Sequence, residues 1–334
     1  MSKLSMSFAC GLYDRMSPLQ TGEVQADGID INFVPVHHPR DLFDRMVAGL
    51  EFDASEMSAS EYITRHVAGK SDFIAIPVFP SRMFRHGFIT VNTKFIKSPK
   101  DLEGKKIGVQ LYTMTAAVWI RSVLQHDLKL DLSGVQWVEG AIESPAPHGK
   151  PTVLPPLKPV SIKANTSGKS LSQLLEEGEI QAVIGADLPT CYGKATHIQR
   201  LFENFKEEEK AYFKRTGVFP IMHLVVLRRT FHEKHPFAAT SLFNALNESK
   251  SLAFKRMRYL GALRYMLPWL PSELDEIDEV FGGDPWPYGI EENRKPLEAL
   301  VQALFDQSMT ERVVPIEELF APVRGHNWKR DTTR

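Results

Sequence analysis

The sequence predicts a two-lobed α/β protein with mixed, mostly parallel sheets and a helical C-terminal region. Through the first two thirds of the chain, strand-like segments, in which apolar and polar residues alternate, are followed by segments whose apolar residues recur at helical spacing. The alternation runs to about residue 90, restarts near residue 100 and ends with a strand-like segment at 219–229, after which only helical spacing remains. Two α/β units joined by two connections predict a hinged cleft. Ligands of open α/β sheets bind beyond the carboxyl ends of the strands.

These segments also set the expected domain boundaries. We expect a discontinuous first lobe made of residues 1–92 and 219–326, a second lobe made of residues 93–218, and a disordered tail over 327–334. The second lobe is therefore inserted into the first.

The first lobe contains short elements at regular intervals. Its expected elements are strands at 4–10 and 28–36, a helix at 39–49, a short strand within 51–58 and a helix at 61–68. Two prolines, Pro77 and Pro80, interrupt the apolar runs that follow. Because proline cannot donate to a strand ladder, these runs favour an edge strand or a connection.

The second lobe repeats the alternation and then gives way to helices. Its expected elements are a strand within 101–110, a helix at 111–128, strands at 135–140 and 180–186, and helices at 170–180 and 203–216. Residues 143–168 contain six prolines, which favour a surface loop because proline disrupts both ladders and helices. Further helices are expected at 236–260, 272–281, 291–308 and 316–320.

Composition excludes several classes of protein. With 40 Lys and Arg against 41 Asp and Glu, the 334-residue chain has a net charge of −1, whereas nucleic-acid-binding proteins usually carry a basic excess. No apolar run approaches the ~20 residues that cross a bilayer, and the start of the chain lacks the apolar core of a secretory signal. Its two cysteines, Cys10 and Cys191, are far apart and favour reduced, buried thiols. We therefore expect a cytoplasmic protein.

Several short blocks of the chain together resemble one known family, the 4,5-dihydroxyphthalate decarboxylases. The blocks are IPVFPSRMFRH, DLEGKKIGV, TAAVWIR, GVFPIMH, LPW, DPWPYGIEENR and ELFAP. The resemblance covers about residues 51–322 and implies a type II periplasmic-binding-protein-like fold. It also implies an intracellular, cofactor-independent carboxy-lyase of phthalate degradation that releases CO2 and protocatechuate from 4,5-dihydroxyphthalate. Residues 139–150 and 186–190 depart from the family pattern and leave the exact substrate open.

Decarboxylation of such a substrate sets clear chemical requirements. The site must hold a dianion, leave one carboxylate poorly solvated and protonate the ring carbon that bears it. Arginine suits the first task because its planar fork pairs bidentately with carboxylates. Arg82 and Arg85 follow a predicted strand near the hinge, where they form a carboxylate clamp or face solvent. The adjacent His86 is a candidate proton donor or a structural histidine.

Other candidates follow the remaining predicted strands. His223 lies where the chain returns to the first lobe, and it is either the general acid or a core histidine. Thr113 and Thr115 begin a helix whose N–H groups and dipole favour an anion, although one of them could simply be an N-cap. The remaining candidates for substrate contacts, each placed by its position after a strand, are Tyr13, Arg15, Glu56, Ser58 and Asp187.

Two other functions are weighed against this one. The weaker is a pyrimidine-synthase-like enzyme on this fold, which would need a cofactor-binding lysine and a cysteine-rich motif, and the cysteine-rich motif is absent. The same fold also serves non-catalytic solute-binding proteins of the ABC-transporter type, here for a small aromatic or carboxylate ligand. No nucleotide-binding loop, hydrolase elbow or metal-ligand spacing occurs, so we expect no cofactor and no metal. The expected partner is a small aromatic dicarboxylate, without nucleic acid or membrane. The helical tail and the WPYG cluster at 286–289 offer apolar surface for a homo-oligomer.

Overall fold

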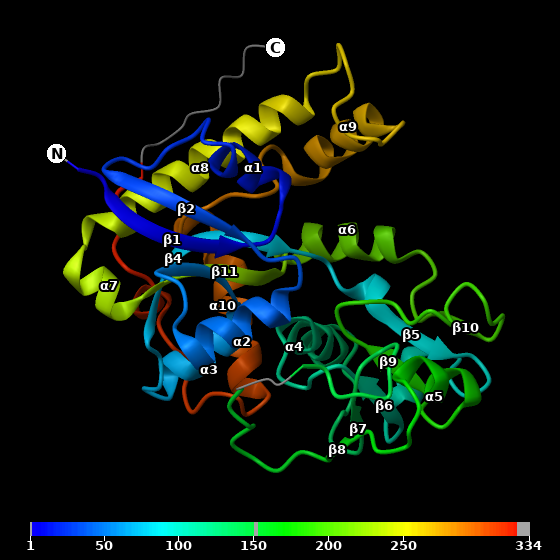
Figure 1. The fold of residues 1–334 in the computed structure, drawn as a ribbon. Helices are drawn as coiled ribbons and strands as arrows, with labels where there is room; N and C mark the ends of the chain where they lie inside the picture. The colour runs from blue at the N-terminus through cyan, green and yellow to red at the C-terminus, as the bar shows by residue number, and fades with distance from the viewer. Residues whose placement is uncertain (1, 150–152, 326–334) are drawn as a thin grey trace.

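Two sheets, each covered by helices, form the two lobes of the protein (Figure 1). A computed structural model describes residues 2–149 and 153–325. The first sheet has the strand order β2-β1-β3-β11-β4 and the second the order β10-β5-β9-β6-β7-β8. Both sheets are mixed, because β11 and β5 run antiparallel to their neighbours. The expected tail at 327–334 lies outside the described residues.

The first sheet confirms most of the strands expected in the first lobe. Its strands are β1 (Leu4–Cys10), β2 (Ile29–Pro35), β3 (Ala54–Ser58), β4 (Phe73–Arg82) and β11 (Ile221–Arg228). The strand β4, which carries Pro77 and Pro80, lies at the edge of the sheet, as the prolines predict. The strand β11 enters from the far end of the chain and pairs with β3 on one side and β4 on the other.

The second sheet contains two strands that the sequence did not indicate. Its strands are β5 (Ile89–Asn92), β6 (Lys106–Val109), β7 (Gln136–Glu139), β8 (Ile162–Ala164), β9 (Ala182–Ile184) and β10 (Ile198–Arg200). The strand β8 lies inside the proline-rich segment that we expected to be a loop. Three residues are too few to show a period, so β8 and β10 form only because β7 and β5 provide a ladder beside them.

The expected boundary between the lobes is displaced by several residues. We assigned residues up to 92 to the first lobe, but β5 pairs with β9 and β10 of the second sheet. The first crossing therefore lies between the end of β4 at Arg82 and the start of β5 at Ile89. This short connection contains Arg85 and the 3₁₀ turn η2 (His86–Phe88).

Apart from the short helices α1 and α7, which the sequence did not indicate, the helices agree with the expected spacing to within a few residues at their ends. They are α1 (Ser17–Gln20), α2 (Pro39–Gly49), α3 (Ala59–Val67), α4 (Thr115–Ser122), α5 (Leu171–Glu177), α6 (Phe205–Thr216), α7 (Arg229–Lys234), α8 (Phe237–Met257), α9 (Leu270–Phe281) and α10 (Arg294–Asp306). The expected helix at 111–128 begins later and ends in a π-helical turn, η4 (Val123–Asp127). The segment at 316–319 is a 3₁₀ turn.

The C-terminal helices pack against the first lobe, and α4 connects them to the second. The indole nitrogen of Trp119 in α4 donates to the carbonyl of Ile221 at 2.9 Å, and Arg121 donates to Gln307 at 2.8 Å.

Cys10 and Cys191 are both buried and unpaired, as expected. Within the described ranges, no helix is both long enough and apolar enough to cross a bilayer.

Candidate active site

A carboxylate and a histidine meet on the first sheet, beside the second lobe. Glu56 lies in β3 and His223 in β11, where His223 pairs with Ser58 and Glu56 with Val225. Because side chains alternate between faces, this register places Glu56 and His223 on one face as a diagonal pair. The Nδ1 atom of His223 lies 2.6 Å from Oε1 of Glu56.

Glu56 is completely enclosed and receives several donors. The Tyr13 hydroxyl donates to Oε1 at 2.7 Å, and the backbone N–H of Gly11 donates to Oε2 at 3.0 Å. Burial alone would raise the pKa of Glu56, but the bonds from His223, Tyr13 and Gly11 outweigh it and lower this pKa to about 2. Glu56 is therefore ionised at neutral pH.

The carboxylate of Glu56 fixes the orientation of the His223 ring. With Nδ1 held by Glu56, the proton on that side stays at Nδ1 and only Nε2 is left for a ligand. The edge of the ring packs against Phe43 of α2, with ring centroids 5.0 Å apart. The His223 side chain is 17% exposed, whereas that of Glu56 is 1% exposed. The pair thus consists of a buried carboxylate, Glu56, and an imidazole, His223, that has one accessible nitrogen. Such a pair suits acid–base catalysis.

The beginnings of two helices, one from each lobe, meet in a cluster of hydroxyl groups. Ser58 precedes α3 and Thr115 begins α4, and their hydroxyl oxygens lie 2.9 Å apart. The backbone N–H of Ser60 donates to the Thr115 hydroxyl at 3.1 Å. The buried hydroxyl of Thr113 has no partner among the described residues. Neither helix has a side-chain N-cap bond, so the first-turn N–H groups and both dipoles favour an anion here.

Arg85 connects the hinge with the wall of the second lobe. Its Nη1 donates to the carbonyl of Ala186 at 3.3 Å, and its Nε lies 3.3 Å from the sulfur of Met222. Its Nη2 has no hydrogen-bond partner within the described part of the chain. Burial lowers the pKa of Arg85 to about 10, partly offset by the charges of Asp187 and Glu209, so the side chain remains a cation. Asp187 itself accepts from Gln110 at 3.1 Å.

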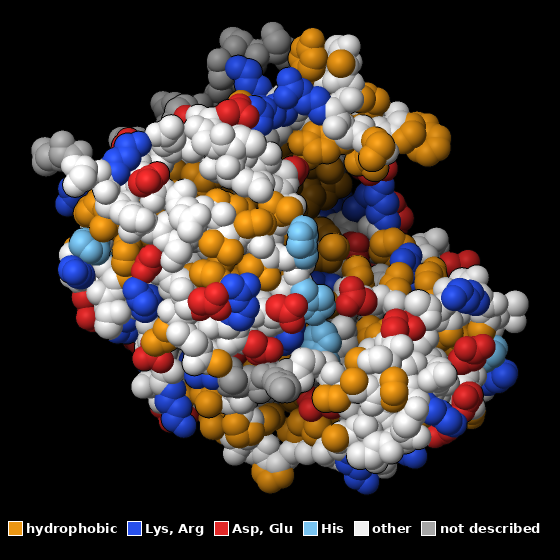
Figure 2. All heavy atoms as spheres, viewed as in Figure 1, with side chains coloured by type: hydrophobic (Ala, Val, Ile, Leu, Met, Phe, Trp, Pro, Cys, Tyr) orange, Lys and Arg blue, Asp and Glu red, His pale blue; other side chains and the backbone are white. Residues whose placement is uncertain are grey.

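Histidine side chains line the boundary between the lobes on the face shown in Figure 2, which is hollowed beside them. His38 precedes α2 of the first lobe and His148 lies in a loop of the second, with ring centroids 6.2 Å apart. Burial, followed by the positive charges of His38 and Arg40, lowers the pKa of His148, and Asp187 partly opposes this effect. The loop that carries His148 therefore approaches both Asp187 and the first lobe.

Three of the candidates are held in other roles. Arg82 points into the first lobe, where it donates to the carbonyls of Phe219 and Pro287, both at 3.2 Å, and to the side chain of Asn293. It is thus a buried structural arginine, and the expected clamp of Arg82 and Arg85 does not form. Arg15 donates to the carbonyl of Pro80 and stacks between Tyr13 and Trp286, so it positions Tyr13.

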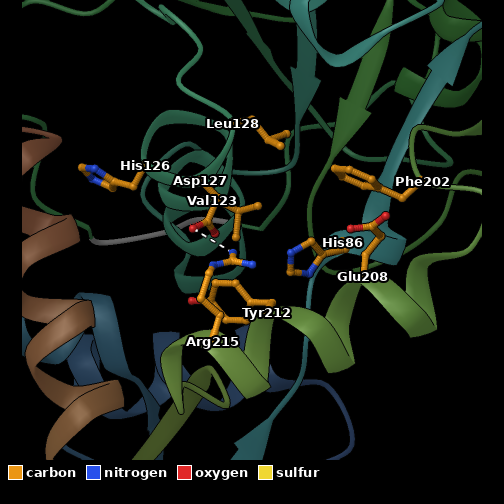
Figure 3. A pocket seen from close by; sticks show the side chains of 9 residues that line it. All are labelled: His86, Val123, His126, Asp127, Leu128, Phe202, Glu208, Tyr212 and Arg215. Carbon is orange, nitrogen blue, oxygen red and sulfur yellow. Dashed lines mark ion pairs between the residues drawn. The ribbon is translucent and has the colours of Figure 1, made fainter.

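The third displaced candidate, His86, lies in a separate cavity near the hinge. This cavity of about 320 Å³ is lined by residues of η2, α6 and η4 and includes neither Glu56 nor His223 (Figure 3). The His86 ring packs against Tyr212 and Phe202, with centroids 5.2 and 5.6 Å away. Burial lowers the pKa of His86 to about 4, so it is neutral and poorly suited to donate a proton at neutral pH.

The WPYG cluster also has an internal role. Tyr288 is buried, and the Trp286 indole donates to the carbonyl of Phe79 at 2.9 Å. Asp284 pairs with Lys250 at 2.6 Å and accepts from the backbone N–H of Trp286, which holds the turn. The aromatic groups of this cluster therefore pack largely within the first lobe, and an oligomer contact at this place stays a prediction.

The structure brings together site residues that are far apart in the sequence. Tyr13, Ser58, Thr113, Thr115 and His223 gather around one place, and Glu56, which we had placed after β3, lies within it. Phe43 and Ser60 were missed because each also fits an ordinary helix pattern. The one available signal was the glutamate within the short strand ASEMS, since a carboxylate that is buried in a sheet needs several donors. Among the described residues, no group of three or more histidines, cysteines or acids is arranged to hold a metal ion.

Comparison with known proteins assigns the chain to a family. It is 36% identical over 331 residues to the 4,5-dihydroxyphthalate decarboxylase of Comamonas testosteroni, covering 98% of this chain and 100% of that protein. The chain belongs to the 4,5-dihydroxyphthalate decarboxylase family. A second family member, from Pseudomonas putida, is 42% identical over 193 residues, which is 58% of this chain and 74% of that protein. No protein-family model matches the chain.

Solved structures show which fold this decarboxylase-family chain adopts. The periplasmic aliphatic sulphonate-binding protein SsuA of Escherichia coli matches with a TM-score of 0.54 at 13% identity, covering 100% of this chain and 97% of that one. The sulfonate-binding SsuA of Methylobacillus flagellatus matches with a TM-score of 0.57 at 12% identity, covering 96% and 92%. The predicted periplasmic-binding-protein-like fold is therefore confirmed.

Proposed function

We propose that this protein decarboxylates a hydroxylated aromatic dicarboxylate, 4,5-dihydroxyphthalate, to protocatechuate and CO2 in the site between its lobes, without a cofactor. Membership of the 4,5-dihydroxyphthalate decarboxylase family supports the substrate and the reaction. The observation that carries the mechanism is the Glu56–His223 pair beside the hydroxyl cluster at the starts of α3 and α4. Together they provide a proton donor next to an anion site.

Binding divides the two substrate carboxylates between different partners. One carboxylate accepts hydrogen bonds from the Thr113 and Ser58 hydroxyls and the free N–H groups at the start of α4. Arg85 supplies a cation at the opposite wall for the other polar groups of the substrate. The carboxylate that leaves is the one beside His223, where Phe43 excludes water and favours loss of its charge.

Proton transfer from His223 completes the reaction. The ring hydroxyl para to the leaving carboxylate pushes electrons to the carbon that bears it, and this carbon takes the proton from Nε2 of the His223 imidazolium. The C–C bond then breaks, its electron pair restores the aromatic ring, and CO2 departs. Glu56 remains ionised throughout and balances the charge of the imidazolium. Water returns the proton to His223 after product release.

Purified protein is expected to convert 4,5-dihydroxyphthalate to equal amounts of CO2 and protocatechuate without any added cofactor. Mass spectrometry of the product and trapped CO2 measure the two amounts, with boiled protein as the control. Absence of CO2 release from a panel of hydroxyphthalates, with and without divalent metal ions, would contradict the proposal.

The variant Thr115→Val is expected to raise KM for this substrate about tenfold, with a smaller change in kcat. Valine keeps the shape of the side chain but removes the hydroxyl that orders Ser58 and Ser60, and a hydrogen bond to a charged group contributes about 1.5–3 kcal/mol. Steady-state kinetics measure both constants. Thr310→Val is the matched control, because that buried hydroxyl has no partner among the described residues. Equal KM values for the two variants would show that the hydroxyl cluster is not part of the binding site.

A second candidate is binding of the same class of ligand without turnover. The fold shared with the two sulfonate-binding proteins favours it. Calorimetry with 4,5-dihydroxyphthalate that shows tight binding, together with no product after prolonged incubation, would replace the decarboxylase proposal with this one.

For the location of the protein we propose the cytoplasm, which the two buried, unpaired thiols support. Fractionation of cells that produce the full-length native gene product tests this location.

A further inference from the structure

The cavity beside the hinge, which contains His86, lies outside the candidate active site. Its volume is about 320 Å³, and η2, η4 and α6 with the residues before it provide its lining (Figure 3). Ligand pockets in proteins begin at about 300 Å³, whereas one water molecule occupies about 30 Å³. The cavity is therefore large enough for a molecule with a single aromatic ring.

Aromatic and aliphatic side chains form much of this lining. Tyr212 in α6 and Phe202 before it flank the His86 ring, with ring centroids 5.2 and 5.6 Å from it. Val123 and Leu128, from η4 and the residue after it, also line the cavity. Aromatic rings attract each other in offset or edge-on arrangements at centroid distances of about 4.5–7 Å. The flat ring of a ligand would therefore find suitable neighbours here.

His86 contributes a polar atom that has no partner. Its side chain is 7% exposed, and its Nδ1 atom makes no hydrogen bond within the described part of the chain. Oε1 of Glu209 lies 3.9 Å from Nδ1, which is too far for a hydrogen bond. Because the ring is neutral, Nδ1 is an acceptor in one tautomer and a donor in the other. A hydroxyl group both donates and accepts, so it fits either tautomer.

The charges around the cavity disfavour an anionic ligand. Asp127 and Glu208 place two carboxylates in the lining, and Arg215 already pairs with Asp127 at 3.1 Å (Figure 3). The other basic side chain of the lining, His126, has its Nε2 atom 3.1 Å from Asp306 of α10. A ligand carboxylate would therefore be repelled by Glu208, whereas a neutral hydroxyl group can donate to it.

We propose that this cavity binds a neutral, hydroxylated aromatic ring, at a site separate from that of the substrate. The ring packs against Phe202 and Tyr212, one hydroxyl bonds to Nδ1 of His86, and an adjacent hydroxyl donates to Glu208. Phenolic hydroxyls lose their proton only near pH ~10, as the tyrosine side chain does, so such a ligand is uncharged at neutral pH. The two carboxylates of the lining disfavour the dianionic substrate.

The position of the cavity relates it to catalysis, and this step rests on the proposed function. His86 directly follows Arg85, and the backbone N–H of Gly87 donates to Glu209 of α6 at 3.2 Å. The turn η2 therefore adjoins both the cavity and Arg85 of the candidate active site. A ligand that contacts both His86 and α6 stabilises the present position of η2, so it opposes any movement of the hinge when substrate binds.

Calorimetry with catechol tests the site in the full-length protein. Catechol is a neutral ring with two adjacent hydroxyls. Saturating phthalate, a dianion that lacks hydroxyls, is present to occupy the anion site between the lobes. One catechol is expected to bind per chain under these conditions. His86→Leu is expected to weaken this binding about tenfold, because leucine cannot bond to a hydroxyl.

The matched control is His232→Leu. The Nδ1 atom of His232 is also buried and has no partner among the described residues, but His232 lies in α7 of the first lobe and does not line the cavity. This variant is expected to bind catechol as the wild type does. Leu128→Trp, which places a larger side chain in the cavity, is expected to abolish binding. Circular dichroism checks that each variant is folded.

Three outcomes overturn the proposal. Absence of catechol binding means that the cavity holds only water. Equal Kd values for His86→Leu and His232→Leu mean that catechol binds elsewhere, and this comparison is decisive even if phthalate does not bind. Tighter binding of benzoate than of catechol at this site contradicts the preference for a neutral ring.

These binding measurements do not depend on catalysis, so failure of the second site and failure of the proposed function are distinguishable. If both hold, catechol is expected to raise KM for 4,5-dihydroxyphthalate several-fold in the wild type but not in His86→Leu. Steady-state kinetics at several catechol concentrations measure this difference. An equal rise in both proteins would place the effect of catechol at the active site and contradict the link through η2.

Discussion

Replacing His223 with alanine is expected to lower kcat for CO2 release by at least about 100-fold, the smaller end of what a positioned acid contributes. Its ring is held by Glu56 at Nδ1 and leaves Nε2 for the substrate, so no neighbouring group replaces the lost proton donor. KM is expected to change little, because the carboxylate that stays on the ring binds at the hydroxyl cluster and Arg85 binds other polar groups of the substrate, away from His223. Steady-state kinetics with 4,5-dihydroxyphthalate measure the two constants.

The matched control for this variant is His126→Ala. His126 is half-exposed on the surface and pairs with Asp306, so its loss is expected to leave kcat within about twofold. Addition of imidazole to His223→Ala is expected to restore part of the activity, since a free base can enter the space of the missing ring. Full activity of folded His223→Ala would require another proton donor and would remove this residue from the mechanism.

Changing Glu56 is expected to affect activity and stability in different ways. Glu56→Gln keeps the size of the side chain but removes the charge that fixes the tautomer of His223, and we expect kcat to fall on the order of 10²-fold or more. Glu56→Ala also leaves the hydroxyl of Tyr13 and the N–H of Gly11 without an acceptor inside the protein. Such a loss in a buried charged network destabilises a fold by about 3–5 kcal/mol.

Urea denaturation measures the free energy of unfolding, with Glu51→Gln as the control, because Glu51 is an exposed partner of Arg45. Acid titration gives a second readout. The pKa of Glu56 is lowered to about 2, so its stabilising contribution is fully present above pH ~4.5, its ordinary pKa, and is lost as the pH falls toward 2. Glu56→Gln is therefore expected to flatten the fall in stability between pH 4.5 and 2. An unchanged acid profile would mean that Glu56 is not ionised in the folded protein.

Local sequence patterns predicted much of the fold and part of the candidate site. Helix α2 was expected at its observed bounds because its apolar residues recur at helical spacing, and β4 was expected at an edge because of its prolines. Ser58 and the pair Thr113 and Thr115 were expected near a ligand because strand and helix ends are readable from period and turn residues. In contrast, the sequence could not distinguish Arg85, which lies at the candidate site, from Arg82 and His86, which do not. All three residues belong to one short segment after a predicted strand.

By itself, therefore, the sequence determined the α/β class, the insertion of one lobe into the other and the family resemblance, all of which depend on neighbouring residues or on blocks of identity. Only the tertiary structure decided which side chains meet. Glu56 and His223 are 167 positions apart and face each other because β11 pairs antiparallel with β3 in one register, and a shift of one residue would turn His223 to the opposite face. Likewise, burial among carbonyls made Arg82 structural, while the cavity beside His86 exists only because η2, η4 and α6 pack around it.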